Sequence, residues 1–199
     1  MKITWVGNIP DTYLHKMAKI EILKPLAKKG HNISLIIPSS SIRHQTKDLK
    51  IETISIPIKS LRLVSQIIFN VVLLFFLPIY ILRSKPSFII TVPDGTIFGI
   101  LSIVLLKKLG FKLILDIRST PVETVGFRGL IKIFRFNVSV SVAKNMFDGM
   151  TIITPLMKKE VCDRFSINPD TVGIFGSAVR TELFDVKKYA KERKKLRKV

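Results

Sequence analysis

The sequence predicts an α/β fold with a mostly parallel sheet and helices on both of its faces. Short apolar runs typical of buried strands alternate with longer amphipathic or apolar segments typical of helices. Turn signals such as Gly-Asn, Pro-Asp-Gly and Asn-Pro-Asp separate them. Strands that alternate with helices pair in parallel, because each helix returns the chain to the edge where the next strand starts. The length of 199 residues suits one such domain with room for an appendage.

The first third of the chain is expected to run strand, helix, strand, strand. The expected strands are 2–7, 31–38 and 50–57. The helix between the first two strands begins near Asp11 or Thr12, and Gly30 ends it. Pro25 lies inside this helix and should kink or interrupt it.

The stretch 63–82 is twenty residues without a charge, between Arg62 and Arg83. It is long enough to span a bilayer. Its polar residues and its proline argue against a span, and it also fits a helix that crosses between two strands: Ser65, Gln66, Asn70 and Pro78. We favour a helix that lies partly in the core and partly in a membrane interface. A true span and a helix packed wholly in the core remain alternatives.

The second half of the chain continues the alternation of strands and helices. Strands are expected at 87–92, 112–116, 149–153 and 171–175, and helices at 96–108, 127–146 and 154–165. Thr154 is the expected N-cap of the last of these helices, with Pro155 at its first position. A basic helix is expected from about Asp185. The sequence therefore divides into one domain, 1–185, and a basic helical tail or linker, 186–199.

The formal net charge of +19 favours an anionic partner. The segment 187–199 contains eight Lys and Arg residues and one Glu, so part of the excess is local. Nucleic acid is one anionic class, but most aromatic residues are Phe within apolar runs, which suits a core better than a base-stacking surface. We therefore expect a phosphorylated substrate or an anionic membrane surface, and no nucleic acid.

Several classes of site are missing from the sequence. It contains no GxxxxGK[ST], GxGxxG or HExxH motif, and its three histidines lie on different expected elements without ligand spacing. Cys162 is the only cysteine, which excludes an intrachain disulfide and a cysteine-based zinc site. The residues themselves thus contain no motif for a metal site or for a tightly bound cofactor.

Chemistry-bearing residues follow the expected strands, most densely in the stretch KLILDIRSTPVET, 112–124. Ligands of open parallel sheets lie beyond the carboxyl ends of the strands. This places the following residues along one edge: Gly7, Asn8, Asp94, Asp116, Arg118, Ser119, Glu123 and, one turn into a helix, Lys158. The structural alternative is that Asp116 only caps a turn and Arg118 pairs with Glu123, since structural ion pairs are common.

The order of motifs resembles the N-terminal half of the GT-B glycosyltransferases, in particular the large family 4-like retaining group. Four segments carry the resemblance over nearly the whole chain: KPSFIITVPDG, LILDIRSTPVET, DGMTIITPLMKKEV and VGIFGSAVRTELFD. Gly7-Asn8 stands where the family has its glycine-rich loop, although the loop here has fewer glycines. The resemblance implies a Rossmann-like domain that binds the acceptor and faces a second Rossmann-like domain that binds the nucleotide-sugar donor.

The resemblance also implies roles for individual residues. Asp116 corresponds to the group that points at the reaction centre, and Gly7 and Asn8 to the donor-facing loop. The expected acceptor- or phosphate-binding residues are Asp94, Arg118, Ser119, Glu123, Arg128 and Lys158. The resemblance implies no metal in the site and no cofactor, and the only small molecules implied are the nucleotide-sugar, as substrate, and the acceptor.

The chain departs from the family because the spaced glutamate pair of the donor-binding domain is missing. We expect the acceptor-binding half of a hexosyltransferase that is inactive without a donor-binding domain or separate subunit. The alternative is a non-catalytic subunit that recruits such an enzyme to the membrane. The expected acceptor is lipid-linked or a glycan, and the expected location is cytoplasmic, peripheral on the inner face of the cell membrane.

Overall fold

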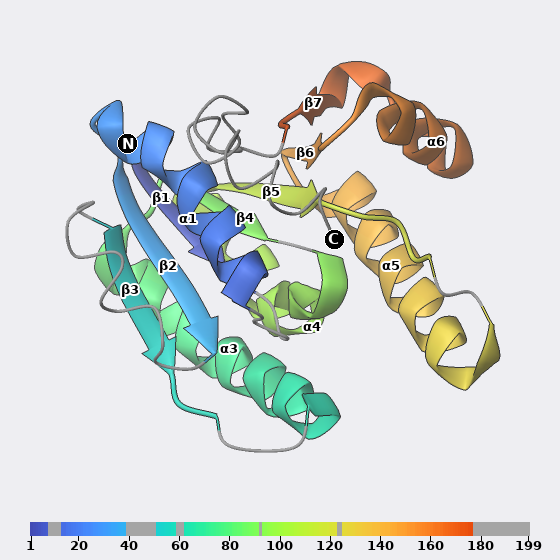
Figure 1. Ribbon diagram of the computed structural model, residues 1–199. Coiled ribbons are helices and arrows are strands. Elements are labelled where there is room, and N and C mark those ends of the chain that lie inside the picture. Colours follow the sequence, from blue (N-terminus) through green and yellow to red (C-terminus); the bar gives the residue numbers. More distant parts are fainter. Residues whose placement is uncertain (8–12, 39–50, 59–61, 92, 123–124, 177–199) are drawn as a thin grey trace, which may run out of the picture.

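The computed structural model describes the backbone of residues 1–7, 13–38, 51–58, 62–91, 93–122 and 125–176, with side chains outside 13–20, 62–63 and 93–94. These residues form one sheet of seven parallel strands in the order β3-β2-β1-β4-β5-β6-β7 (Figure 1). The strands are β1 (Lys2–Val6), β2 (Asn32–Pro38), β3 (Ile51–Ile56), β4 (Phe88–Thr91), β5 (Lys112–Ile117), β6 (Gly149–Ile152) and β7 (Val172–Ile174). The predicted α/β class with a parallel sheet is confirmed.

Helices cover both faces of this sheet, as the sequence predicted. The helices are α1 (Tyr13–Lys28), α3 (Arg62–Ser84), α4 (Pro93–Val104), α5 (Gly126–Met146) and α6 (Pro155–Phe165). Successive side chains of a strand point to opposite faces. Ile3 and Trp5 of β1 pack with α1, whereas Val6 packs with α3 and α4 on the other face. Leu113 and Leu115 of β5 face the same way as Val6, toward α3, α4, α5 and α6.

The winding of the sheet reverses at β1. This strand pairs with β2 on one side and with β4 on the other, so Val6 lies opposite both Ile36 and Thr91. In open α/β sheets, ligands bind beyond the carboxyl ends of strands at such a switch point. The fold therefore places the residues that follow β1, β4 and β5 at the edge where a ligand site is expected.

The start of α4 differs from the sequence-based expectation. The helix begins at Pro93, not at Thr96, so Asp94 lies in its first turn and not in a loop before it. Proline is favoured at the first helical position because its missing N–H would have no intrahelical partner there. The basic helix expected from about Asp185 lies outside the described residues.

The apolar stretch 63–82 forms most of α3, which connects β3 to β4 across the sheet. Among the described residues, α3 is the one helix whose length and composition would allow it to cross a membrane, and 44% of its most apolar window is buried. Phe69, Leu73 and Leu77 are fully buried in the core. A second row of apolar side chains stays exposed: Ile67, Val71, Phe75, Ile79 and Leu82. The helix thus packs on the sheet through one face and leaves an apolar outer face.

Polar side chains of α3 lock it to the start of α4. Gln66 Nε2 donates to the Gly95 carbonyl at 2.6 Å, and Asn70 Nδ2 donates to the same oxygen. Asn70 Oδ1 accepts from the Gly99 N–H at 2.7 Å. Both amide side chains are buried, so these hydrogen bonds satisfy groups that would otherwise destabilise the core. Two of the residues that argued against a membrane span, Gln66 and Asn70, therefore have a structural role.

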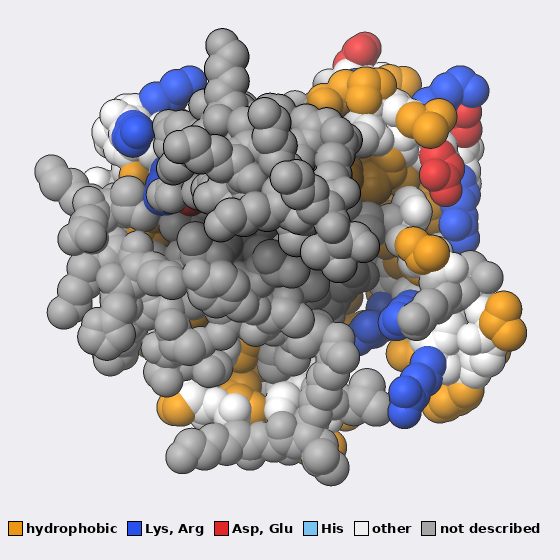
Figure 2. All heavy atoms as spheres, viewed as in Figure 1, with side chains coloured by type: hydrophobic (Ala, Val, Ile, Leu, Met, Phe, Trp, Pro, Cys, Tyr) orange, Lys and Arg blue, Asp and Glu red, His pale blue; other side chains and the backbone are white. Residues whose placement is uncertain are grey.

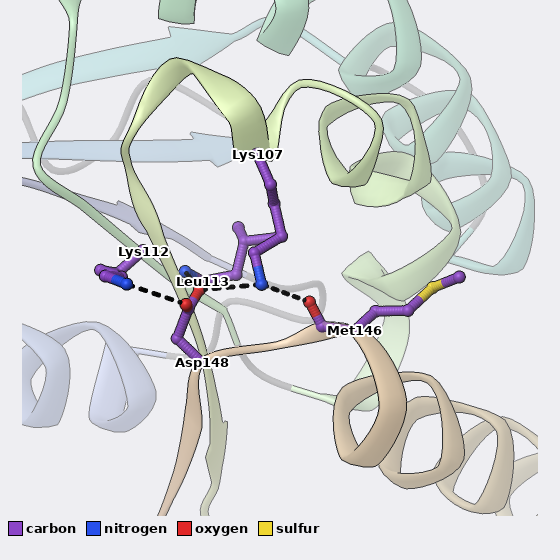
Figure 3. A network of polar contacts seen from close by, with 5 residues as sticks. All are labelled: Lys107, Lys112, Leu113, Met146 and Asp148. Atoms are coloured by element: carbon purple, nitrogen blue, oxygen red, sulfur yellow. Dashed lines mark hydrogen bonds and ion pairs between the residues drawn. The ribbon is translucent and has the colours of Figure 1, made fainter.

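Asp148 connects the amino ends of β5 and β6 through hydrogen bonds and ion pairs (Figure 3). These ends lie at the edge of the sheet opposite the carboxyl ends of the strands, where the site is expected. Its carboxylate accepts from the Leu113 N–H at 2.9 Å and pairs with Lys107 and Lys112 at 3.2 and 3.3 Å. Lys107 Nζ also donates to the Met146 carbonyl at 2.8 Å, at the end of α5. Partial burial opposes ionisation, but the Leu113 N–H and the two ammonium groups outweigh it and lower the pKa of Asp148.

Candidate functional site

Asp116 is the centre of a polar cluster at the carboxyl end of β5. It is fully buried, and both of its carboxylate oxygens accept hydrogen bonds. Thr151 Oγ1 donates to Oδ1 at 2.7 Å, and Arg118 Nε donates to Oδ2 at 2.5 Å. Thr151 reaches Asp116 because the two residues lie opposite each other in the pairing of β5 with β6.

Arg118 connects this carboxylate to two aromatic rings and to the end of β7. Its Nη1 donates to the Phe175 carbonyl at 3.0 Å. The guanidinium carbon lies 5.9 Å from the centre of the Trp5 ring and 5.1 Å from that of Phe175, within cation–π range. Nη2 is buried and has no hydrogen-bond partner among the described residues. These contacts hold the guanidinium in one orientation and leave Nη2 available to donate a hydrogen bond.

The electrostatics of Asp116 reflect its burial. Removal from water raises the pKa of this carboxyl, and Arg118 and Thr151 oppose that rise by stabilising the charged form. Because Thr151 and Arg118 occupy both oxygens, the carboxylate can orient the guanidinium and supply negative potential. Glu123, the expected ion-pair partner of Arg118, lies outside the described residues. Within the described residues, the ion-pair partner of Arg118 is Asp116.

The other predicted site residues either make no hydrogen bond to Asp116 or lie outside the described residues. Gly7 directly follows β1, is buried, and its N–H donates to the Ile36 carbonyl at 2.7 Å. Ser119 is exposed immediately beyond Arg118. Asn8 and Glu123 lie outside the described residues, as does the side chain of Asp94.

Arg128 and Lys158 are not joined to the Asp116 cluster by any contact among the described residues. Arg128 is exposed in the first turn of α5. In Figure 1 this turn is the end of α5 that points away from the sheet. Lys158 lies one turn into α6, where its own N–H donates to the Thr154 carbonyl. That helix is capped as predicted, because the Thr154 side chain accepts from the Met157 N–H and Pro155 occupies the first turn.

Three residues of the cluster were not predicted from the sequence: Trp5, Thr151 and Phe175. Thr151 lies in the middle of a short strand, and only the pairing register with β5 places it beside Asp116. Trp5 joins the cluster because only β4 separates β1 from β5 in the sheet, although β1 and β5 are far apart in sequence. Among the described residues, no group of three or more His, Cys, Asp or Glu side chains is arranged to hold a metal ion.

No family model matches the sequence, and no curated protein matches it either. Solved structures do match. A glycosyltransferase from Rickettsia africae is similar with a TM-score of 0.63 and 14% identity, over 98% of this chain and 49% of that one. Anabaena HepE, solved with UDP and glucose, has a TM-score of 0.60 and 12% identity, over 98% of this chain and 50% of that one.

A UDP-GlcNAc 2-epimerase from Neisseria meningitidis, solved with UDP-GlcNAc, is similar with a TM-score of 0.62 and 13% identity, over 98% of this chain and 53% of that one. The chain thus spans about half the length of the solved proteins that it resembles. At these identities the likeness concerns the fold alone. The chain has a GT-B-like, Rossmann-like fold, the fold of glycosyltransferases and of an epimerase that bind nucleotide-sugars.

Proposed function

We propose that this chain is the acceptor-binding, N-terminal half of a family 4-like retaining glycosyltransferase. Such an enzyme moves a sugar from a nucleotide-sugar to a lipid-linked or glycan acceptor, and here it needs a donor-binding domain to do so. The observation that carries the proposal is the fold match, which extends over 98% of this chain but only 49% of the Rickettsia africae glycosyltransferase. The placement of a buried carboxylate at the carboxyl edge of the sheet supports it.

In this proposal Asp116 provides negative potential near the acceptor hydroxyl and the positive charge that develops on the sugar. Arg118 presents its guanidinium to a phosphate, because a guanidinium forms paired hydrogen bonds with phosphate oxygens. The contacts of Asp116 refine this assignment, since the carboxylate fixes the direction of the guanidinium. Gly7 has no side chain, so the backbone after β1 can approach the donor closely.

An activity assay tests this division of roles. Incubated alone with nucleotide-sugars and lipid acceptors, the chain should give no turnover; turnover by the chain alone would contradict the proposal. In the assembled enzyme, Asp116→Asn should lower the rate by about 100-fold or more, as expected when a charge-stabilising group is lost. Asp163→Asn is the control, since Asp163 is an exposed carboxylate on α6. An unchanged rate in Asp116→Asn would remove Asp116 from this role.

We also propose that the chain lies on the cytoplasmic face of an anionic membrane, and the outer surfaces of α3 and α5 support the membrane contact. The exposed row of α3 is apolar throughout, and α5 contains four basic residues and no acidic one. Exposed apolar side chains lie between these basic residues along the first half of α5: Phe127, Leu130, Ile131 and Phe134 (Figure 2). Each Lys or Arg near an anionic bilayer contributes about 1 kcal/mol to binding.

Flotation with liposomes tests the membrane proposal. The chain should float with phosphatidylglycerol vesicles much more than with phosphatidylcholine vesicles, and salt should weaken the binding. Phe127→Asp should reduce flotation, whereas Leu156→Asp on α6, also at an exposed position, should not. Equal recovery with both vesicle types would contradict the electrostatic part of the proposal.

A second candidate function is a non-catalytic subunit that recruits a donor-binding partner to the membrane. It is favoured by the occupation of both Asp116 oxygens within the fold, which gives this carboxylate a purely structural explanation. The two candidates differ in one result. If recruitment is the only function, Asp116→Asn in the assembled enzyme leaves the rate on a soluble acceptor unchanged.

A further inference from the structure

An apolar pocket of about 210 Å³ lies on the α1 side of the sheet. The strand residues that line it include Ile3, Trp5, Ile90 and Ile114, and Phe175 lies at the end of β7. A second pocket of about 180 Å³ shares Leu26 and Phe175 with the first and is also lined by Lys29. The two pockets are therefore adjacent, and together they are called the recess below.

This recess is unusual for the interior face of a parallel sheet. Such sheets are normally covered on both faces, and protein interiors leave few voids larger than a water molecule. Among the described residues, α1 packs against β1 and β2 on this face, while the other four helices lie on the opposite face. Apolar cavities of about 150 Å³ are known to bind small apolar molecules such as benzene. A recess of this size and lining fits an apolar group.

Two donors at this recess have no partner among the described residues, whereas Thr151, which also lines it, donates to Asp116. Trp5 is 3% exposed, and its indole Nε1 has no hydrogen-bond partner among the described residues. Nη2 of Arg118 also has no partner among the described residues, although the side chain as a whole is 21% exposed. The guanidinium lies over the rings of Trp5 and Phe175, which line the recess. Lys29 adds a second cation along the recess, and none of the described lining residues is Asp or Glu. Buried donors normally have acceptors, so both N–H groups can donate to an acceptor atom of a bound molecule.

We propose that this recess binds a single-chain amphiphile with an anionic head group. Its alkyl or prenyl chain lies against Ile3, Ile90 and Ile114, and its head group accepts hydrogen bonds from Arg118. Asp116 keeps the guanidinium in place for this contact. The site does not depend on the proposed sugar transfer, because it requires only the recess and the oriented Arg118.

Trp5 makes the site directly measurable, because it is the only tryptophan in the chain. We would titrate the full chain with octanoate and with octan-1-ol, below their aggregation limits, and record tryptophan emission. Octanoate should give a saturable change. Octan-1-ol should have an affinity lower by about tenfold or more, since a hydrogen bond to a charged group is lost. No saturable change with octanoate would overturn the proposal. Equal affinities for the two compounds would overturn the role of the anionic head group.

Two variants locate the site. Arg118→Gln should reduce the affinity for octanoate to that for octan-1-ol. Ile114→Phe should fill the recess and weaken both ligands, whereas Leu156→Phe on the exposed surface of α6 should change neither. Circular dichroism shows whether each variant is folded. If Ile114→Phe does not fold, the site is tested by Arg118→Gln and by the affinities of the unchanged chain for the two ligands. Unaltered octanoate affinity in folded Arg118→Gln would contradict the proposal.

Discussion

At the scale of single residues, the two buried or partly buried aspartates of the sheet behave in opposite ways. Asp116 is fully buried with one cation, and its desolvation outweighs the opposing effect of Arg118, so its pKa is raised. Asp148 is less buried and has a backbone N–H and two ammonium groups, so its pKa is lowered. A group with a raised pKa at the carboxyl edge suits a functional role, whereas Asp148 has the contacts of a structural anchor.

Asp148→Asn tests that structural role through its pH dependence. The amide can still accept from the Leu113 N–H, but the pairs with Lys107 and Lys112 are lost. We expect a loss of about 1 kcal/mol of unfolding free energy at pH 7, because partly exposed lysines contribute modestly. The folded-state pKa of Asp148 is depressed, so its contribution is fully present above the unfolded-state pKa and is lost as the pH falls through the folded-state value.

Urea unfolding of the parent chain and of Asp148→Asn, repeated from pH 7 down to about pH 2, measures this difference. The difference in unfolding free energy should shrink as the solution becomes acidic. Asp163→Asn is the control, since its pair with Lys159 is exposed and should change the unfolding free energy by less than about 0.5 kcal/mol. A difference between the parent chain and Asp148→Asn that stays constant with pH would show that the charge of Asp148 does not stabilise the fold.

At the scale of elements, α3 packs closely against α4, and this contact makes α3 part of the domain. Gly99 lets the two helices approach, because a Cβ atom there would lie 2.7 Å from Leu73 Cβ and 3.0 Å from the Asn70 carbonyl oxygen. Asn70 and Gln66 bond to the backbone of α4 at the same place. These contacts explain how a helix of this apolar composition can be part of the domain core.

Gly99→Ala tests the helix contact. In an open helix this substitution would stabilise by about 1 kcal/mol, but here the added methyl group must displace Leu73 or the backbone of α3. Overpacking of a core costs about 1–3 kcal/mol, so we expect a net loss of about 1–2 kcal/mol in chemical denaturation. Gly176→Ala is the matched control: nothing lies within 4 Å of the added atom, and the change should be neutral or slightly stabilising. A stabilised Gly99→Ala protein would mean that α3 and α4 are not packed this closely.

At the scale of the whole molecule, strand order and register decide what the sequence could and could not predict. Asp116 and Arg118 were identifiable because they follow one apolar run and lie two residues apart, on the same side of the chain. Trp5, Thr151 and Phe175 were not, because only the strand order β1-β4-β5-β6-β7 and the pairing of β6 with its two neighbours bring them to Arg118. The start of α4 was missed because Pro93 fits both a turn and a first helical position.

We propose that this chain acts as half of a glycosyltransferase. The most direct measurement is to purify the chain by affinity from the organism that encodes it and to assay the recovered material for sugar transfer to lipid or glycan acceptors. The proposal predicts transfer that depends on a second Rossmann-like domain, either in a co-purified subunit or in a longer polypeptide that contains this sequence, and mass spectrometry would identify it. Recovery of such a domain without any sugar transfer, or transfer by this chain alone, would contradict the claim.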